Sequence, residues 1–334
     1  MIQRIILIGF GTVARGLCEI LRDKARQLHM EYDYEARVVG ICDLRLGTVY
    51  DPEGLAIDTL LAAAETGAFT ENLRDWDAET LIRKGKADVV CELAFTDLET
   101  GEPAATHCRA AFETGKHVVT SNKGPAALHY RELIDLADSH DREFLIEGTV
   151  MSGTPVLNLA EGPLAGNTIT AARGILNGTT NYILTQMEAG MDYAAALSKA
   201  QELGYAEADP TGDVEGYDAR AKVAILANVV MGADLAIQDV TCEGITGITP
   251  ADIAKAAEAN ARWKLIGSVE MTETGVKAAV KPEIMPLTHP LASVMGATNA
   301  LTFTTDLLGD VTIVGPGAGR IETGYSILND LLTL

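Results

Sequence analysis

Residues 204–222, GYAEADPTGDVEGYDARAK, bring several acidic side chains and one lysine into a short stretch of chain. Lys222 opens the apolar run KVAILANVV, and an ammonium carried into an apolar interior needs an anionic partner. Asp218 precedes it by four residues, so the two side chains share one face of a helix. A lysine held in this way can donate a proton to a reacting oxygen. The carboxylates before the lysine are those of Glu207, Asp209, Asp213, Glu215 and Asp218.

The alternative for this stretch is an ordinary salt bridge at the foot of a buried helix, since ion pairs of this spacing are common. The loop before the helix favours a functional role, because it is acidic, is broken by proline and glycine, and leads into a rigid element. We therefore interpret residues 204–222 as a candidate active site. We expect Asp213 to cap a helix over residues 214–231, with Glu215 on the same side as Asp218.

The composition predicts a soluble globular protein with two domains. The 334 residues are 47% hydrophobic with a mean hydropathy of +0.12, which is ample material for cores. The formal charge of −21 argues against a nucleic-acid partner, whose phosphates it would repel. The longest apolar runs, such as residues 223–233, are too short to cross a membrane. The start, MIQRIILIGFG, is typical of a strand and not of a secretory signal, so we expect a cytoplasmic protein with no membrane partner.

The cysteines and histidines form no metal-ligand pattern. The five cysteines contain no C-x-x-C pair, and most have apolar neighbours. The six histidines show no ligand spacing either. We therefore expect neither a disulfide framework nor a transition-metal site.

Apolar runs alternate with amphipathic segments through the first 150 residues, which predicts an α/β fold with a Rossmann-type, doubly wound parallel sheet. The expected strands cover residues 2–8, 37–42, 88–93, 117–120 and 143–146. The expected helices cover residues 13–28, 55–65, 104–113 and 126–139. Later residues predict an α+β domain with a strand at 173–176, helices at 179–188, 193–203 and 214–231, and strands within 263–284.

The first expected strand leads directly into a glycine turn. The sequence IGFGTVARGL contains the pattern G-x-G-x-x-A, and a helix is expected to follow it. In dinucleotide-binding folds the first glycine makes the turn, the second admits the pyrophosphate, and the helix N-terminus attracts the anion. The alternative is a plain glycine turn, but a position between a first strand and a helix favours cofactor binding. The expected cofactor-binding residues are Gly9, Phe10, Gly11, Thr12 and Val13.

Two charged residues at the end of the second expected strand bear on the choice of cofactor. Asp43 lies where an acid that binds the ribose of NAD belongs. Arg45 lies where a partner for the 2′-phosphate of NADP belongs. The sequence therefore leaves the choice between NAD and NADP open.

The loop TSNKGP follows another expected strand, at the edge where open α/β sheets bind their ligands. The alternative for Lys123 is an ordinary surface lysine without a role in binding. A lysine at this edge of a nucleotide-binding sheet nevertheless points toward the reactive end of the cofactor.

Seven segments, in this order, resemble homoserine dehydrogenases: GFGTVARGL, SNKGPAAL, EGTVMSGTP, RGILNGTTNYIL, GYAEADPTGDVEGYDARAK, HPLASVMGATNALTF and GPGAGRIETGYSILNDL. The similarity covers residues 2–332, and RGILNGTTNYIL and GYAEADPT followed by D-x-x-G-x-D-x-x-x-K are highly specific. The resemblance implies the reversible reduction of L-aspartate 4-semialdehyde to L-homoserine with NADP or NAD, in the pathway toward threonine and methionine.

The resemblance also implies roles for individual residues. It places the family's catalytic lysine at Lys222 and the lysine of its N-K loop at Lys123. It places substrate-binding acids at Glu207 and Asp218, with Asp213 as a supporting carboxylate. The late glycine loop GPGAG resembles one that returns to the cofactor, and its expected contact is Gly319.

Members of this family often hold a sodium or similar monovalent ion through one glutamate and backbone carbonyls. The corresponding residues here are Glu147, Val150, Ser152 and Thr154. The segment M-S-G-T departs from the small residues found in many members. The alternative for Glu147 is an acid that caps a loop at a strand end.

The resemblance implies a homodimer of the short form, without a C-terminal regulatory domain. We expect a dinucleotide-binding domain of residues 1–148 with 305–334, and a substrate-binding, catalytic and dimerisation domain of residues 149–304. One alternative is a dehydrogenase or reductase of another amino-acid-pathway semialdehyde. Another is a nicotinamide-sensing protein without turnover, which has no need of both Lys123 and Lys222.

Overall fold

The computed structural model describes residues 2–334 and divides into two compact units. The first unit comprises Met1–Gly153 together with Gly319–Leu334, and the second comprises Thr154–Ala318. The chain therefore leaves the first unit and returns to it.

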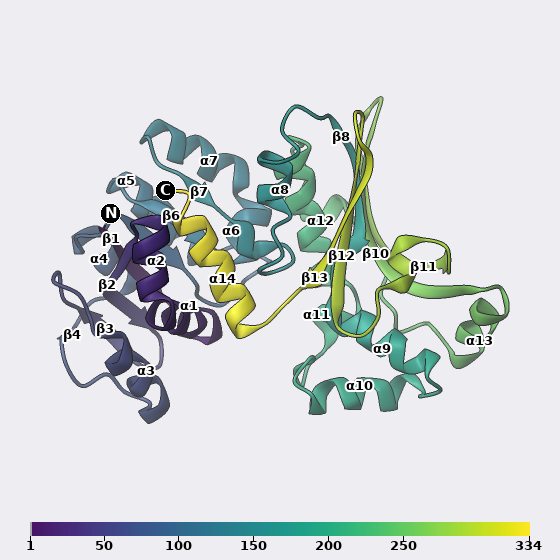
Figure 1. The fold of residues 1–334 in the computed structure, drawn as a ribbon, viewed down its shortest axis with the longest axis horizontal. Coiled ribbons are helices and arrows are strands. Elements are labelled where there is room, and N and C mark those ends of the chain that lie inside the picture. The colour runs from purple at the N-terminus through teal and green to yellow at the C-terminus, as the bar shows by residue number, and fades with distance from the viewer. Residues whose placement is uncertain (1) are drawn as a thin grey trace. The chain divides into compact units, whose positions relative to one another are not determined.

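The first unit is built on a seven-stranded sheet of order β4-β3-β2-β1-β5-β6-β7. Figure 1 shows the strands of this sheet in purple to teal. The pairs from β2 through β1, β5 and β6 to β7 are parallel, which confirms the predicted Rossmann-type sheet. An antiparallel edge of β3 and β4 was not foreseen. The strands are β1 (Ile2–Ile8), β2 (Glu35–Asp43), β3 (Gly47–Tyr50), β4 (Leu73–Arg74), β5 (Val89–Glu92), β6 (His117–Thr120) and β7 (Phe144–Leu145).

Two of the predicted helices of this unit are each divided in two. The expected helix over 13–28 breaks at Lys24, and the one over 126–139 breaks at His129. The helices are α1 (Thr12–Asp23), α2 (Ala25–Tyr32), α3 (Ile57–Thr66), α4 (Ala78–Lys84), α5 (Ala104–Glu113), α6 (Lys123–Leu128), α7 (Tyr130–Ser139) and α14 (Arg320–Leu331). A short 3-10 helix, η1, spans Glu147–Thr149.

The last helix, α14, packs on α1 through two glycines. A Cβ at Gly16 would lie 2.0 Å from the carbonyl oxygen of Arg320, and one at Gly324 would lie 2.5 Å from the amide nitrogen of Leu17. Backbone therefore meets backbone at this crossing, which leaves no room for a side chain. The α14 residues Ile327, Leu328 and Leu331 enter the core of the first unit.

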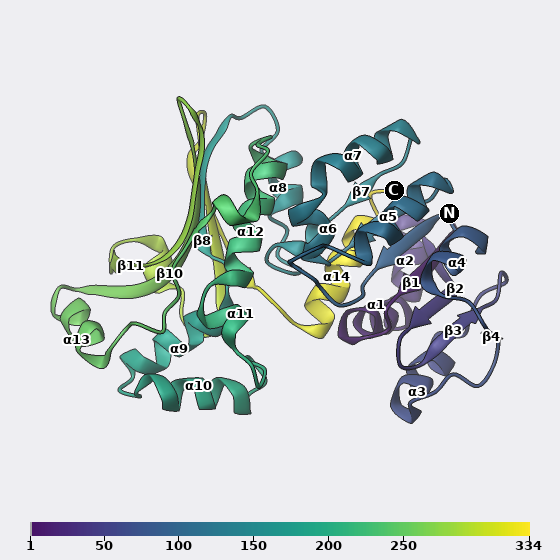
Figure 2. The ribbon, with the colours of Figure 1, turned by 180° about the vertical axis from the view of Figure 1, so that it is seen from behind.

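The second unit has a six-stranded sheet of order β13-β12-β8-β10-β11-β9. Figure 2 shows α11 and α12 on one face of this sheet. The strands are β8 (Ile169–Ile175), β9 (Thr241–Cys242), β10 (Ala261–Thr272), β11 (Gly275–Pro286), β12 (Thr298–Thr305) and β13 (Gly309–Pro316). The helices are α8 (Leu157–Glu161), α9 (Gly178–Glu188), α10 (Tyr193–Glu202), α11 (Thr211–Val214), α12 (Tyr217–Val230) and α13 (Pro250–Glu258), and the 3-10 helices are η2 (Ile237–Asp239) and η3 (Pro290–Ser293).

The boundary near the C-terminus differs from the expected one. Residues 309–316 form β13, which pairs along its length with β12 inside the second sheet. The return to the first unit therefore begins at Gly319 and not near residue 305.

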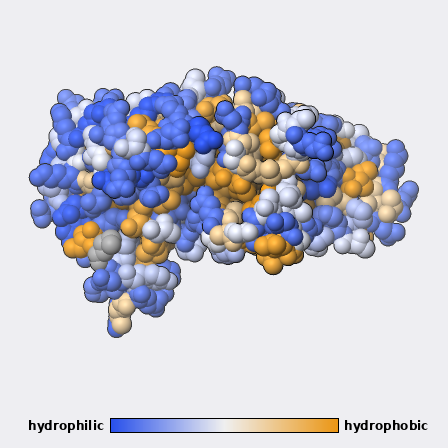
Figure 3. Space-filling model, turned by 90° about the horizontal axis from the view of Figure 1, so that it is seen from above, coloured by the Kyte–Doolittle hydropathy of each residue, from blue (hydrophilic) through white to orange (hydrophobic). Residues whose placement is uncertain are grey.

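Polar side chains dominate the surface seen in Figure 3, with smaller apolar patches between them. This agrees with the strongly acidic composition of the chain. Within residues 2–334, no helix has both the length and the apolar character needed to span a membrane.

We predict that Gly16→Ala destabilises the protein by about 1–3 kcal/mol, because the added methyl group must displace the backbone of α14. Gly247→Ala is the control, since a Cβ there has no heavy atom within 4 Å, and its effect should stay within about 0.5 kcal/mol. Urea unfolding of both variants measures the difference. Equal free energies of unfolding for the two variants would show that the helix crossing is not tight.

Candidate active site

Lys222 is buried in the second unit, and its ammonium donates to two acceptors. The Nζ atom donates to Asp218 Oδ2 at 2.7 Å and to the carbonyl oxygen of Leu176 at 2.7 Å. Its side chain is only 8% exposed. The predicted pairing along one helix face is confirmed, since both residues belong to α12. The ammonium of Lys222 is thus bonded to a side chain of α12 and to the backbone just after β8.

Asn177 joins the acids of this site and was not singled out from the sequence. Its Nδ2 atom donates to Asp213 Oδ1 at 2.7 Å and to Asp218 Oδ2 at 3.0 Å. Its Oδ1 atom accepts from the backbone N–H of Thr180 at 2.9 Å, so Asn177 also caps α9. An asparagine between a strand and a helix is a recognisable N-cap signal, but its bridge to two distant acids has no local signal.

Asp213 does not cap the helix that carries Lys222, which corrects the expectation. The predicted helix over 214–231 is divided into α11 and α12, because Gly216 adopts a left-handed conformation with φ of 83°. Glu215 follows α11 and precedes this break, so it does not share a helix face with Asp218.

The environment of Asp213 raises its pKa. Burial is the main cause, and the negative charge of Asp218 adds to it. The donated hydrogen bond from Asn177 and the charge of Lys222 act in the opposite direction but do not outweigh these effects. Asp213 is therefore a carboxylate held at a cost inside the site.

Glu207 and Asp209 lie apart from this buried group, in the exposed loop between α10 and α11. The backbone carbonyl of Glu207 accepts a hydrogen bond from Gln201 Nε2 at 3.0 Å. Hydrogen bonds from Thr211 lower the pKa of Asp209, first from its side chain and then from its backbone N–H, which lies 3.1 Å from Asp209 Oδ1. The acidic stretch thus separates into a partly buried set, with Asp213 and Asp218, and an exposed set, with Glu207 and Asp209.

In the first unit, the glycine turn between β1 and α1 has the geometry of an anion site. Gly9 has φ of 88°, and a Cβ there would lie 2.6 Å from the carbonyl oxygen of Leu93. A Cβ at Gly11 would have open space around it, and no side chain caps the helix at this residue. The N–H groups of Thr12 and Val13 therefore lie at the N-terminus of α1, where they can donate to a ligand. The helix dipole favours negative charge at this end.

Asp43 holds this turn together from the end of β2. Its carboxylate accepts from the backbone N–H groups of Phe10 at 2.9 Å, Arg45 at 2.9 Å and Leu46 at 3.0 Å. Burial alone would raise the pKa of Asp43, but these three donors outweigh it and the pKa lies below its ordinary value. Asp43 is therefore an anion at neutral pH. The residue Arg45 is exposed.

Lys123 is the first residue of α6 and is partly buried. The preceding residue, Asn122, caps this helix by accepting from the backbone N–H of Gly124 at 3.0 Å. Gly319 lies at the start of α14 with φ of 140°, and so belongs to the same unit.

The predicted ion ligands offer only oxygen donors. Glu147, Val150 and Ser152 are buried in the first unit, and Thr154 is the first residue of the second. Met151 and Ser152 have left-handed φ values of 59° and 55°, and such strain is frequent at functional sites. One carboxylate with hydroxyl and carbonyl oxygens suits a hard cation. Among residues 2–334, no three His, Cys, Asp or Glu side chains are grouped as metal ligands.

A Rossmann-type sheet with an open glycine turn, joined to a second unit with a buried lysine–carboxylate pair, defines a nicotinamide-dependent oxidoreductase. The family described as homoserine dehydrogenase matches residues 155–332, and the NAD binding domain of homoserine dehydrogenase matches residues 9–147. The chain belongs to the homoserine dehydrogenase family.

Named relatives cover nearly the whole chain. The NAD(+)-dependent homoserine dehydrogenase of Pseudomonas canavaninivorans is 48% identical over 98% of this chain and 95% of its own length. The crystal structure of a putative homoserine dehydrogenase from Archaeoglobus fulgidus has a TM-score of 0.90 at 38% identity, covering 100% and 99% of the two chains. A hyperthermophilic archaeal homoserine dehydrogenase in complex with NADPH has a TM-score of 0.84 at 30% identity, covering 100% and 97%.

We predict that Asp213→Asn stabilises the protein at pH 7, because the folded state no longer holds a carboxylate whose pKa is raised. The penalty from Asp213 is fully present above its folded-state pKa and disappears below the unfolded value of about 3.9. The gain in stability should therefore vanish as the pH falls toward 4 and below. Thermal unfolding across this pH range measures it.

Asp209→Asn is the matched control, with the opposite sign. The pKa of Asp209 is lowered, so its carboxylate stabilises the fold above the unfolded pKa and loses this effect as the pH falls. The control variant should be slightly less stable than the wild type at pH 7. A loss of stability at pH 7 in both variants would contradict the raised pKa assigned to Asp213.

Proposed function

We propose that this protein catalyses the reversible, NAD(P)-dependent reduction of L-aspartate 4-semialdehyde to L-homoserine, in the biosynthesis of threonine and methionine. The observation that carries the proposal is the buried group of Lys222, Asp218, Asn177 and Asp213, in a chain that belongs to the homoserine dehydrogenase family. The names of the relatives support the same activity.

Lys222 is proposed to act as the general acid. A nicotinamide, when bound, would supply the hydride to the aldehyde carbon, and negative charge would then develop on the carbonyl oxygen. Two N–H groups of Lys222 are directed at Asp218 and at the Leu176 carbonyl, so the third can serve the substrate oxygen. An aligned ammonium stabilises the developing alkoxide and transfers a proton to it. In the oxidation of homoserine the same group, once neutral, accepts the proton.

The substrate is an amino acid, and its ammonium group needs an anion. Glu207 and Asp218 are proposed to bind the substrate, with Asp213 in support through Asn177. The exposure of Glu207 is compatible with a residue that meets an incoming ligand. In this arrangement Asp218 both holds Lys222 and faces the substrate, and exposed Glu207 contacts the substrate alone.

Lys123 and Gly319 are proposed to contact the cofactor, together with the turn from Gly9 to Val13. Lys123 lies at the carboxyl edge of the parallel sheet, where this class of fold binds its ligands. The positive charge of Lys123 at this edge can stabilise negative charge on the cofactor and on the reacting substrate. Lys123 is therefore also proposed as a catalytic residue.

We propose NAD as the preferred cofactor. Asp43 is an anion beside the glycine turn, and a carboxylate in this place repels the 2′-phosphate that distinguishes NADP. A relative of 48% identity is named as NAD(+)-dependent, which supports the same choice. Exposed Arg45 is a candidate contact for the phosphate when NADP is used.

We further propose a cytoplasmic homodimer and a sodium or similar ion held by Glu147, Val150, Ser152 and Thr154. The dimer is supported by the second sheet, which has helices α11 and α12 on one face. Its strands β11 and β13 expose the apolar side chains of Ile284 and Val314, which are 51% and 54% exposed. Sedimentation of the purified protein tests the oligomeric state.

The decisive test is the oxidation of L-homoserine, followed by the absorbance of the reduced nicotinamide. Turnover with homoserine supports the proposal. Turnover only with the alcohol of another semialdehyde would favour a different amino-acid-pathway dehydrogenase. Cofactor binding without any turnover would favour a nicotinamide-sensing protein.

We predict that Lys222→Met lowers turnover by roughly 100-fold or more, the usual loss when a general acid is removed. Cofactor affinity should change little. Lys199→Met is the control, because Lys199 forms an exposed pair with Glu202 on α10, and it should retain normal turnover. If Lys222 were only a structural partner, its loss would cost roughly 3 kcal/mol of stability and activity per folded molecule would survive. Turnover and thermal unfolding on the same sample separate the two roles.

We predict that Asp43→Asn improves the affinity for NADPH relative to NADH by about tenfold, which corresponds to removal of about 1.4 kcal/mol of charge repulsion. Asparagine keeps one oxygen acceptor for the N–H groups of Arg45 and Leu46, and only the hydrogen bond from the N–H of Phe10 is lost. Asp51→Asn is the control, because Asp51 accepts a similar turn hydrogen bond, from the N–H of Glu53 after β3. Fluorescence titration with both reduced cofactors measures the ratio. An unchanged ratio in Asp43→Asn would remove Asp43 as the determinant of preference.

A further inference from the structure

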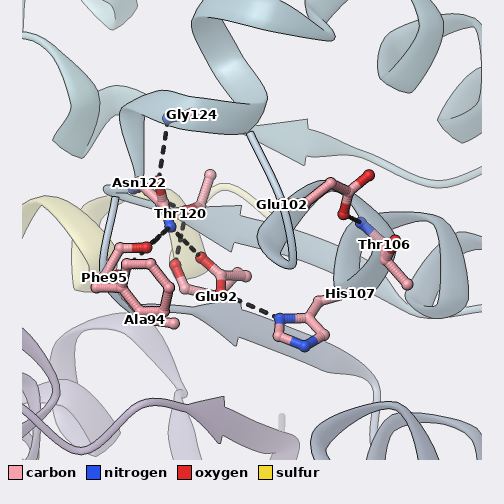
Figure 4. Close-up of polar contacts among 9 residues, drawn as sticks. All are labelled: Glu92, Ala94, Phe95, Glu102, Thr106, His107, Thr120, Asn122 and Gly124. Atoms are coloured by element: carbon pink, nitrogen blue, oxygen red, sulfur yellow. Dashed lines mark hydrogen bonds and ion pairs between the residues drawn. The ribbon is translucent and has the colours of Figure 1, made fainter. Parts of the chain in front are cut away.

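Glu92 is a fully buried carboxylate at the carboxyl end of β5 (Figure 4). Its Oε2 atom accepts from Asn122 Nδ2 at 3.0 Å, and its Oε1 atom lies 3.3 Å from His107 Nδ1. Its backbone carbonyl accepts from Thr120 Oγ1 at 2.6 Å. None of these contacts involves the glycine turn or the ion segment.

A carboxylate in this position is expensive to maintain. A buried carboxylate loses its hydration, and it is retained only where fixed donors replace the lost water. An apolar residue would fill the end of β5 without this cost. The structure therefore keeps the charge at a specific place, beside the strand β6 that leads into Lys123.

Asn122 transmits the position of Glu92 to the next helix. Its Nδ2 atom also donates to the carbonyl oxygen of Phe95 at 3.0 Å, and its Oδ1 atom accepts from the N–H of Gly124 at 3.0 Å. Both ends of the amide are therefore engaged, and the side chain has one orientation. The backbone N–H of Asn122 is held as well, by Thr120 Oγ1 at 2.9 Å.

Lys123 follows Asn122 directly and is the first residue of α6. The loop has little freedom, since a Cβ at Gly124 would lie 2.6 Å from the carbonyl oxygen of Asp97. The backbone at Lys123 is thus held by the helix cap, and the cap residue Asn122 is held by its contact with Glu92.

We propose that Glu92 is a positioning residue for Lys123, acting through the amide of Asn122. This inference rests on the proposed function of Lys123. The charge of Glu92 is the active element, because a charged acceptor holds an amide donor more strongly than a neutral one does. His107 contacts the other carboxylate oxygen of Glu92, Oε1, and not the Oε2 atom that Asn122 contacts.

A double-mutant cycle tests the proposal. Homoserine oxidation is measured for the wild type, Glu92→Gln, Lys123→Met and the double variant. Glu92→Gln preserves the volume and an oxygen acceptor and removes the charge. We expect it to lower kcat/KM about tenfold, and Lys123→Met to lower it about 100-fold. In the double variant, kcat/KM should equal that of Lys123→Met alone within about twofold, because Glu92 has no further route to the reaction.

A purely structural Glu92 would give a different result. Its effect on kcat/KM would then be the same with and without Lys123, and the double variant would fall by the product of the two factors. That outcome overturns the proposal, as does normal kcat/KM in folded Glu92→Gln. Tyr34→Phe is the control, since it removes another buried hydrogen bond of this unit, from Tyr34 to Gln3, and should keep normal kcat/KM.

A second pair of variants covers the case in which Glu92→Gln does not fold. Asn122→Ser keeps a residue that can cap α6 but is too short to reach Glu92. It should reproduce the tenfold loss and show no further loss when combined with Lys123→Met, and a multiplicative loss overturns the proposal. A wild type without homoserine turnover refutes the proposed function instead. The same cycles are then scored by NADH dissociation constants, with additivity again as the overturning result.

Discussion

Burial of the Lys222 ammonium is the constraint around which the second unit is organised. A cation in this position must be surrounded by fixed acceptors, and these come from α12 and from the chain after β8. Asn177 then links Asp218 to Asp213 and caps α9. Groups from α9, α11, α12 and the end of β8 thus form one hydrogen-bonded cluster around the Lys222 ammonium. The first unit has a counterpart of opposite sign in buried Glu92, whose partners hold the start of α6.

The sequence was a good guide wherever a periodic apolar pattern was long and local. The bounds of β1, β6 and α5 agree with those expected, because each is an uninterrupted apolar or amphipathic run. The short edge strands β3 and β4 were missed, since two to four residues give no clear period and their pairing depends on the neighbouring strand. The helix breaks at Lys24 and His129 were missed because each lies inside a continuous amphipathic run.

The site shows the same division between local and distant information. The pair of Asp218 and Lys222 was predictable because both residues belong to one helix. The separate fates of Asp213 and Glu207 were not, because burial of one and exposure of the other depend on the packing of α11 and its loop. Glu92 was assigned only to a strand, since its partners His107 and Asn122 lie 15 and 30 residues away in the sequence.

The glycine crossing between α1 and α14 has a consequence for the order of folding. The core of the first unit includes Ile327, Leu328 and Leu331, which the ribosome adds only after the whole second unit. During synthesis the nascent nucleotide-binding sheet therefore leaves the groove along Gly16 without its helix, exposing apolar surface until α14 has been made. The second unit is continuous in sequence and can close first. Completion of the first unit then waits for α14 to bridge a long separation along the chain.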